Sequence, residues 1–86
     1  MYQLNYRRQA RNYLARLPLK IKTTIIDRLH QIATDPGLAR PDIKILKARE
    51  GYRLRIGPYR VIYTLHKKDL VIEVVKIRPR GDIYKG

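Results

Sequence analysis

The first half of the chain carries the apolar spacing of one short strand followed by two helices. The strand is predicted by three residues that alternate with polar ones, Tyr2, Leu4 and Tyr6. The first helix is predicted by an apolar face made of Ala10, Tyr13, Leu14 and Leu17. After Pro18 a second helix is predicted from about Leu19 to Ala33, with an apolar face made of Ile21, Ile25, Ile26, Leu29, Ile32 and Ala33. Because the link at Pro18 is short, we expect an antiparallel helical hairpin.

From Ile43 onward the apolar period changes to two, which predicts strands. The segments are Ile43–Lys47, which is weak, then Tyr52–Ile56, Tyr59–Leu65 and Leu70–Ile77. Gly57 and Pro58 alone separate the middle pair and suit a type II′ turn. The prediction is one α+β domain over residues 1–86. It has an N-terminal strand and two helices packed on one face of a mostly antiparallel sheet of three to four strands.

The two-residue turn fixes which residues face one another in the central hairpin. If Ile56 pairs with Tyr59, then Arg55 faces Arg60 and Arg53 faces Ile62. The face under the helices is then lined by Tyr52, Leu54, Ile56, Tyr59, Val61 and Tyr63. The opposite face carries Arg53, Arg55 and Arg60. Directly opposed like charges are destabilising, and an anion bound between them would reverse that cost, so the pattern predicts an anion site.

The alternative is that these arginines extend into water or are neutralised by Glu73. A four-residue loop from His66 to Asp69 would pair Leu65 with Leu70 and place Glu73 opposite Ile62, on the basic face. One carboxylate cannot balance three arginines, so the anion site remains the favoured interpretation.

Composition points to the kind of anion. Among 86 residues, 20 are Lys or Arg and 7 are Asp or Glu, which gives a net charge of +13. Such a field attracts nucleic acid, anionic membrane or acidic protein, and we favour nucleic acid. The chain has no cysteine and only two histidines, His30 and His66, so we expect no metal and no cofactor. Without a signal peptide or a long apolar run, we expect a cytoplasmic protein with no membrane partner.

The C-terminal segment adds further candidate chemistry. Pro79 and Gly81 argue against a regular central strand there. A bent segment would bring Arg78 or Arg80, together with Tyr84, to the rim of the basic face. The phenol of Tyr84 can donate or accept a proton, and its ring can stack on a base.

The central hairpin, Gly51–Tyr63, resembles that of the RelE/ParE toxin superfamily, RelE branch. The shared pattern is tyrosine, basic, apolar, basic, apolar, glycine, any residue, tyrosine, arginine, two apolar residues and tyrosine. The resemblance covers nearly the whole chain, through Ala10–Pro18, Asp35-Pro36, Ile45–Lys47 and the ending Arg80–Tyr84.

The resemblance implies the toxin of a type II toxin–antitoxin system. RelE members are ribosome-dependent endoribonucleases that cleave mRNA in the 30S A site without a metal, by attack of the ribose 2′-OH, and so inhibit translation. It also implies a cognate acidic antitoxin, with operator DNA contacted only through the toxin–antitoxin complex. The alternatives are a ParE-like poison of DNA gyrase with the same fold and a non-enzymatic RNA- or ribosome-binding module.

The resemblance also transfers residue roles. The catalytic set it implies is Arg53, Arg55, Arg60, Tyr84 and either Arg80 or Arg78, and the RNA contacts expected are Lys44, Lys47, Arg49, Arg53 and Arg55. Arg60 would stabilise the transition state, and Tyr84 would be the base. Pro79 stands where many members have a histidine, which removes a possible general acid. Arginines at positions 53 and 55, where some members have lysines, make proton transfer from there unfavourable.

Overall fold

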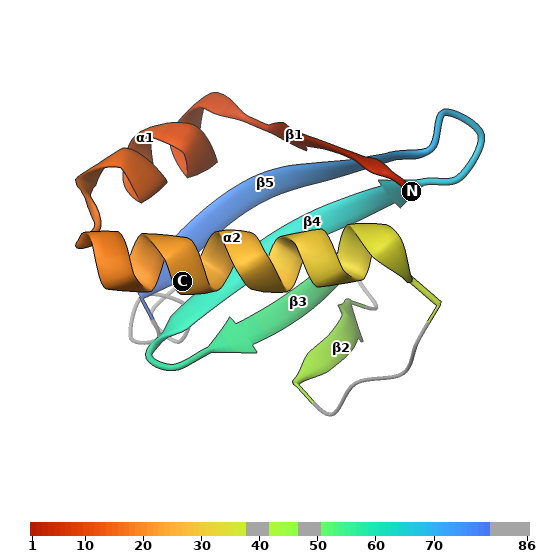
Figure 1. Cartoon of the computed structure of the whole chain (residues 1–86). Helices are drawn as coiled ribbons and strands as arrows, with labels where there is room; N and C mark the ends of the chain where they lie inside the picture. The colour runs from red at the N-terminus through yellow and green to blue at the C-terminus, as the bar shows by residue number, and fades with distance from the viewer. Residues whose placement is uncertain (38–41, 47–50, 80–86) are drawn as a thin grey trace.

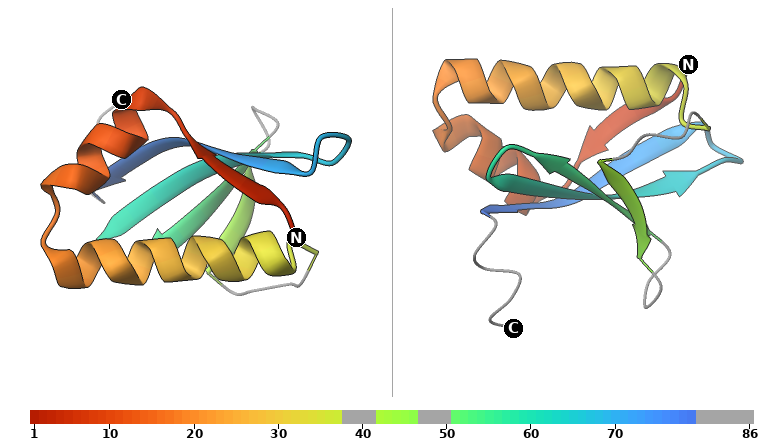
Figure 2. Two further views of the ribbon diagram at one scale, coloured as in Figure 1. Left: turned by 45° about the horizontal axis from the view of Figure 1, so that its top comes forward. Right: turned by 90° about the horizontal axis from the view of Figure 1, so that it is seen from below.

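Seven helices and strands make up the part of the chain that the computed structural model describes, residues 1–37, 42–46 and 51–79. In chain order they are β1 (Gln3–Tyr6), α1 (Arg8–Arg16), α2 (Leu19–Thr34), β2 (Ile43–Leu46), β3 (Gly51–Ile56), β4 (Tyr59–His66) and β5 (Val71–Pro79). Both helices lie on one face of a single twisted sheet, and no described helix covers the other face (Figures 1 and 2). The predicted α+β class is therefore confirmed.

The sheet has five strands in the order β1-β5-β4-β3-β2. β1 runs parallel to β5, and the other neighbours are antiparallel. The N-terminal strand thus belongs to the same sheet as the four later strands. A parallel pair needs a long crossover connection, and the chain from α1 to β4 supplies it between β1 and β5.

The two helices separate at Pro18. Leu17 before it has an extended backbone, because a residue that precedes proline is disfavoured in the helical region. Figures 1 and 2 show the helices diverging from this link as a wide V over the sheet. α1 lies along β5, and the far end of α2 reaches β1, where the Tyr2 amide donates to the Ala33 carbonyl at 2.9 Å. None of the described helices is long and apolar enough to span a membrane.

The core fills the space between the helices and the inner face of the sheet. Its largest fully buried apolar side chains come from α2 (Ile25, Leu29 and Ile32) and from the three central strands (Leu54, Val61, Ile72, Val74 and Ile77). Tyrosines border it: the rings of Tyr52 and Tyr63 stack with centroids 5.3 Å apart, and Tyr13 meets Tyr59 edge to face. The residues predicted to lie beneath the helices do so.

The predicted register of the central hairpin is confirmed. Ile56 pairs with Tyr59, Arg55 with Arg60 and Arg53 with Ile62. Gly57 has φ of +53°. The ring of Pro58 fixes its own φ near −65°, so the turn has the positive-then-negative φ of type II′.

The predicted register of the next hairpin is wrong by two residues. The turn covers residues 67–70, and Leu65 pairs with Ile72 rather than with Leu70. Leu70 adopts φ of +54°, so it belongs to the turn and not to a strand. An irregularity at Ile62/Tyr63 shifts the pairing further along. As a result Glu73 lies opposite Thr64, while Lys76 takes the place opposite Ile62.

β5 also continues further than the sequence indicated. It runs through Arg78 to Pro79, which corrects the prediction that Pro79 ends any regular strand there. The Ile77 amide points away from β4, because it donates to the Gln9 side chain. Pro79, two residues later, has its nitrogen on the same side of the strand. The proline therefore removes no hydrogen bond to β4.

Candidate nucleic-acid interface

Three arginines form a row across three neighbouring strands on the face that the helices leave open. Arg55 of β3 pairs with Arg60 of β4, and Arg60 pairs with Arg78 of β5. Directly paired residues share a face of the sheet, and neighbouring strands lie about 4.8 Å apart. The row therefore places three guanidinium-bearing residues within roughly 10 Å of sheet width. We call it the arginine row.

A second row of residues, three of them cations, runs beside the arginine row. On β3, β4 and β5 it is displaced from the arginine row by two residues. Lys44 of β2 pairs with Arg53, Arg53 pairs with Ile62, and Ile62 pairs with Lys76. We call Lys44, Arg53, Ile62 and Lys76 the mixed row. Lys44 and Arg53, both proposed as RNA contacts, thus join the basic face, and Lys76 is an addition that the sequence had not singled out.

The two described carboxylates on this face are paired with arginines that belong to neither row. Glu73 accepts from Arg7 at 2.8 Å, so it does not neutralise the arginine row as the alternative supposed. Asp42 precedes β2, and its carbonyl accepts from the amide of Arg55 at 2.9 Å. The Asp42 carboxylate nevertheless pairs with Arg28 of α2. Both acids are therefore engaged away from the cations.

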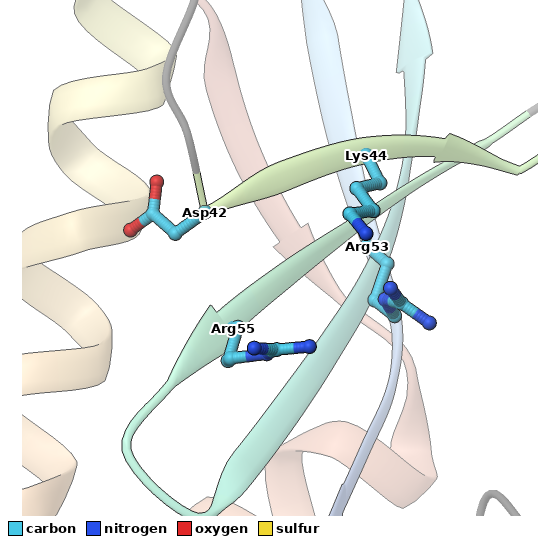
Figure 3. Close-up of a pocket in the computed structure, with 4 residues that line it drawn as sticks. All are labelled: Asp42, Lys44, Arg53 and Arg55. Atoms are coloured by element: carbon cyan, nitrogen blue, oxygen red, sulfur yellow. The ribbon is translucent and has the colours of Figure 1, made fainter.

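A depression of about 230 Å³ lies on the basic face, and Figure 3 shows the residues that line it. Asp42, Lys44, Arg53 and Arg55 line it. The Asp42 carboxylate turns toward α2, whereas Lys44, Arg53 and Arg55 project on the other side of it (Figure 3). The depression consequently presents positive charge to anything that enters it.

The members of the arginine row differ in exposure. Arg55 is exposed and Arg78 is partly exposed, but Arg60 retains only 1% of its accessible surface. Arg60 lies on the predicted face, not beneath the helices. Its burial does differ from the expectation that its side chain contacts a substrate directly. In this structure Arg60 contributes positive potential from below the surface, and Arg55 and Arg78 are the members that an anion can reach.

The remaining candidates fall into two groups. Lys47, Arg49, Arg80 and Tyr84 lie outside the described residues. His30 is exposed on α2, and His66 ends β4 rather than standing in a loop, with its ring 2.9 Å from the Thr64 hydroxyl. Neither histidine belongs to the arginine row or the mixed row. On the inner face, burial raises the pKa of the Tyr6 phenol.

Sequence reasoning missed Gln9, which positions the end of β5. Its side-chain amide donates to the Ile77 carbonyl and accepts from the Ile77 amide, each at 3.1 Å. Beyond Val74, where pairing with β1 ends, Gln9 thus replaces a strand partner beside Arg78. A polar residue among arginines early in α1 gives no signal for a contact with backbone 68 residues away.

Comparisons with known proteins agree with this architecture. A family model described as the ParE toxin of the type II toxin–antitoxin system parDE matches residues 4–84. A comparison with curated protein sequences found no match.

Several solved structures are similar to this chain, at different levels of sequence identity. A chain of the archaeal RelE–RelB complex from Pyrococcus horikoshii OT3 is 30% identical, with a TM-score of 0.81 over 93% of this chain and 96% of that one. The E. coli RelBE toxin–antitoxin complex contains a chain 16% identical, with a TM-score of 0.78 over 92% of this chain and 96% of that one. A YoeB/ParE toxin from Agrobacterium tumefaciens is 16% identical, with a TM-score of 0.76 over 90% and 96%. The last two show a shared fold.

Proposed function

Since this chain belongs to the RelE/ParE superfamily of type II toxin–antitoxin toxins, we propose that it is an endoribonuclease that cleaves mRNA on the ribosome and so inhibits translation. The observation that carries the proposal is the arginine row, Arg55, Arg60 and Arg78, on the open face of the sheet. Repulsion between opposed cations costs stability. A bound phosphate offsets this cost.

The arginine row suits the transition state of RNA cleavage. The ribose 2′-oxygen attacks the adjacent phosphorus and forms a P–O2′ bond, and the P–O5′ bond breaks. The products are a 2′,3′-cyclic phosphate and a 5′-hydroxyl. Negative charge gathers on the non-bridging oxygens during this step, and preorganised donors stabilise it, by about 3–4 kcal/mol for one donor at a comparable oxyanion site.

Proton transfer needs other groups. Guanidinium does not give up its proton in proteins, so the arginine row does not supply the base that takes the 2′-OH proton. Tyr84 remains the candidate base. Sparse acid–base equipment is consistent with a reaction in which the ribosome supplies much of the substrate positioning.

The main alternative is a ParE-like poison of DNA gyrase. The family model is named for ParE, while the relative at 30% identity is from a RelE–RelB complex. The arginine row favours cleavage, because three guanidinium-bearing residues on one face suit the charge that develops on a phosphate in the transition state.

Primer extension on ribosome-bound mRNA tests the proposal. The wild-type protein should produce discrete breaks, and Arg78→Ala should reduce them by 100-fold or more, the scale of losing one oxyanion donor. Lys68→Ala, which changes an exposed lysine in a turn, is the matched control and should cut like the wild type. Arg60→Ala should also lose cleavage, with its fold checked by circular dichroism because Arg60 is buried.

Two outcomes would count against cleavage. If Arg78→Ala and Arg60→Ala both cut at the wild-type rate, the assignment of the arginine row is wrong. If the wild-type protein leaves mRNA intact and instead traps DNA breaks in a gyrase supercoiling assay, the ParE-like alternative holds. A plain RNA-binding module would show neither activity and only a salt-dependent affinity.

We also propose a cognate antitoxin with an acidic segment. The similar chains come from toxin–antitoxin complexes, and a net charge of +13 favours an acidic partner that folds on binding. Coexpression with the product of a neighbouring acidic reading frame should yield a stable complex and suppress cleavage. A partner that binds without suppressing cleavage would not be the antitoxin.

A further inference from the structure

The mixed row is parallel to the arginine row and displaced from it by one repeat of every strand. Arg53 stands two residues from Arg55, Ile62 two from Arg60 and Lys76 two from Arg78. Two residues along a strand span about 6.5–7 Å and return to the same face. The displacement is comparable to the separation of neighbouring phosphates along a single-stranded polynucleotide.

We propose that Lys44, Arg53 and Lys76 form a second phosphate subsite, which binds the phosphate next to the one held by the arginine row. This inference rests on the proposed function and adds to it a two-phosphate footprint and a substrate contact, Lys76. The polynucleotide would run along the strand direction, crossing from one row to the other.

The chemistry of the mixed row differs from that of the arginine row. Lysine is a compact point charge that cannot form the bidentate contact that arginine makes with phosphate oxygens. Two of its three cations are lysines, so this row suits holding a phosphate mainly by charge rather than by bidentate contacts. The half-buried Ile62 between Arg53 and Lys76 offers an apolar surface on which a ribose can rest.

The described carboxylates near the mixed row are paired with other arginines, so its cations can bind a phosphate. Lys44 and Arg53 line the depression in Figure 3, and the Asp42 carboxylate, which points toward α2, is paired with Arg28. On β5, the described acid nearest in sequence to Lys76 is Glu73, which is engaged by Arg7. No described carboxylate therefore forms an ion pair with the three cations of the proposed subsite.

The test compares short DNA probes, which lack the 2′-OH and cannot be cleaved. A dinucleotide with one phosphate and a trinucleotide with two are titrated into the full-length protein, with affinity followed by amide NMR shifts. Lys76→Ala should weaken binding of the two-phosphate probe about fivefold, the size of one exposed ion pair. It should leave the one-phosphate probe unchanged, whereas Arg78→Ala weakens both probes.

The salt dependence gives a second readout. For the two-phosphate probe, Lys76→Ala should lower the slope of log affinity against log salt by about 0.7, the value for one lost contact to a single strand. Lys68→Ala is again the control and should change neither probe nor slope.

The outcomes separate this inference from the proposed function. If Lys76→Ala weakens neither probe, or both equally, the second subsite is wrong, while Arg78→Ala and primer extension still decide whether the arginine row acts in cleavage. If the wild-type protein binds neither probe and cuts no mRNA, the proposed function fails and the subsite fails with it.

Discussion

The two faces of the sheet are built from alternate residues of the same strands, and they follow opposite rules. One row on the inner face joins Leu54, Val61 and Ile77, all fully buried. The arginine row is made of the residues next to these three in sequence, and it lies on the opposite face. The inner row gains stability by removing apolar surface from water, whereas the outer row loses stability through opposed like charges. Stability and anion binding are therefore assigned to separate faces, and substitutions can address them separately.

Leu54→Ala should have the largest effect on the inner face. The side chain is fully buried on β3, so its truncation leaves a cavity. We expect the free energy of unfolding to fall by about 3 kcal/mol, measured by urea denaturation. Ile45→Ala on β2, where the side chain is 72% exposed, is the matched control and should cost far less. A similar loss at both positions would show that the inner face is not packed as described.

Gln9→Ala should have the next largest effect on stability, through the backbone of β5 that both faces share. It leaves both the amide and the carbonyl of Ile77 without their partner. The free energy of unfolding should fall by about 1–2 kcal/mol. Asn12→Ala, which changes another exposed polar residue of α1, should have little effect. Because Arg78 follows Ile77, Gln9→Ala should also reduce mRNA cleavage. Unchanged cleavage would show that the arginine row does not depend on the hydrogen bonds between Gln9 and Ile77.

Arg28→Gln tests whether Asp42 is kept from the outer face. Without Arg28, the Asp42 carboxylate is able to turn to Arg55, which lies opposite it. Affinity for the two-phosphate DNA probe should fall about threefold, the scale of an exposed ion pair. Adding Asp42→Asn should restore it, since the competing charge is then gone. A loss that the double variant does not recover would mean that Arg28 acts in another way.

Arg55→Gln should have the smallest effect on stability, and in the opposite direction. Relief of repulsion with Arg60 should raise the free energy of unfolding by about 0.5 kcal/mol, within the range for a cross-strand pair. The same variant should bind the DNA probes more weakly. Lys68→Gln should change neither quantity. If Arg55→Gln instead lowers stability, the arginine row is held by contacts that outweigh its repulsion.

Local rules made much of this fold predictable from the sequence. The turn at Gly57 fixed the pairing of Arg55 with Arg60 because a two-residue loop leaves only one register. The loop after His66 has no such constraint: the predicted strand starts at Leu70, yet the backbone of Leu70 is left-handed. That error, with the irregularity at Ile62/Tyr63, hid the place of Lys76 opposite Ile62.

The parts of the site that the sequence did not predict depend on contacts between distant segments. The hydrogen bond of Gln9 to β5 and the ion pair of Arg28 with Asp42 both join different elements. No local sequence pattern predicts either contact. The burial of Arg60, on the face that no described helix covers, is likewise not revealed by a face assignment alone. Alternation decides which face a residue occupies, while its exposure depends on everything around it.

The short connection at Gly57 has a consequence for how this protein can vary. A single residue inserted between Arg55 and Gly57 would transfer every side chain before it to the opposite face. Arg53 would then enter the apolar layer, and Tyr52 would lose its place beside Tyr63. The length of this segment is therefore fixed by the two faces of the sheet. Counting residues between the two opposed arginines is thus a more demanding criterion for recognising a functional relative than overall similarity.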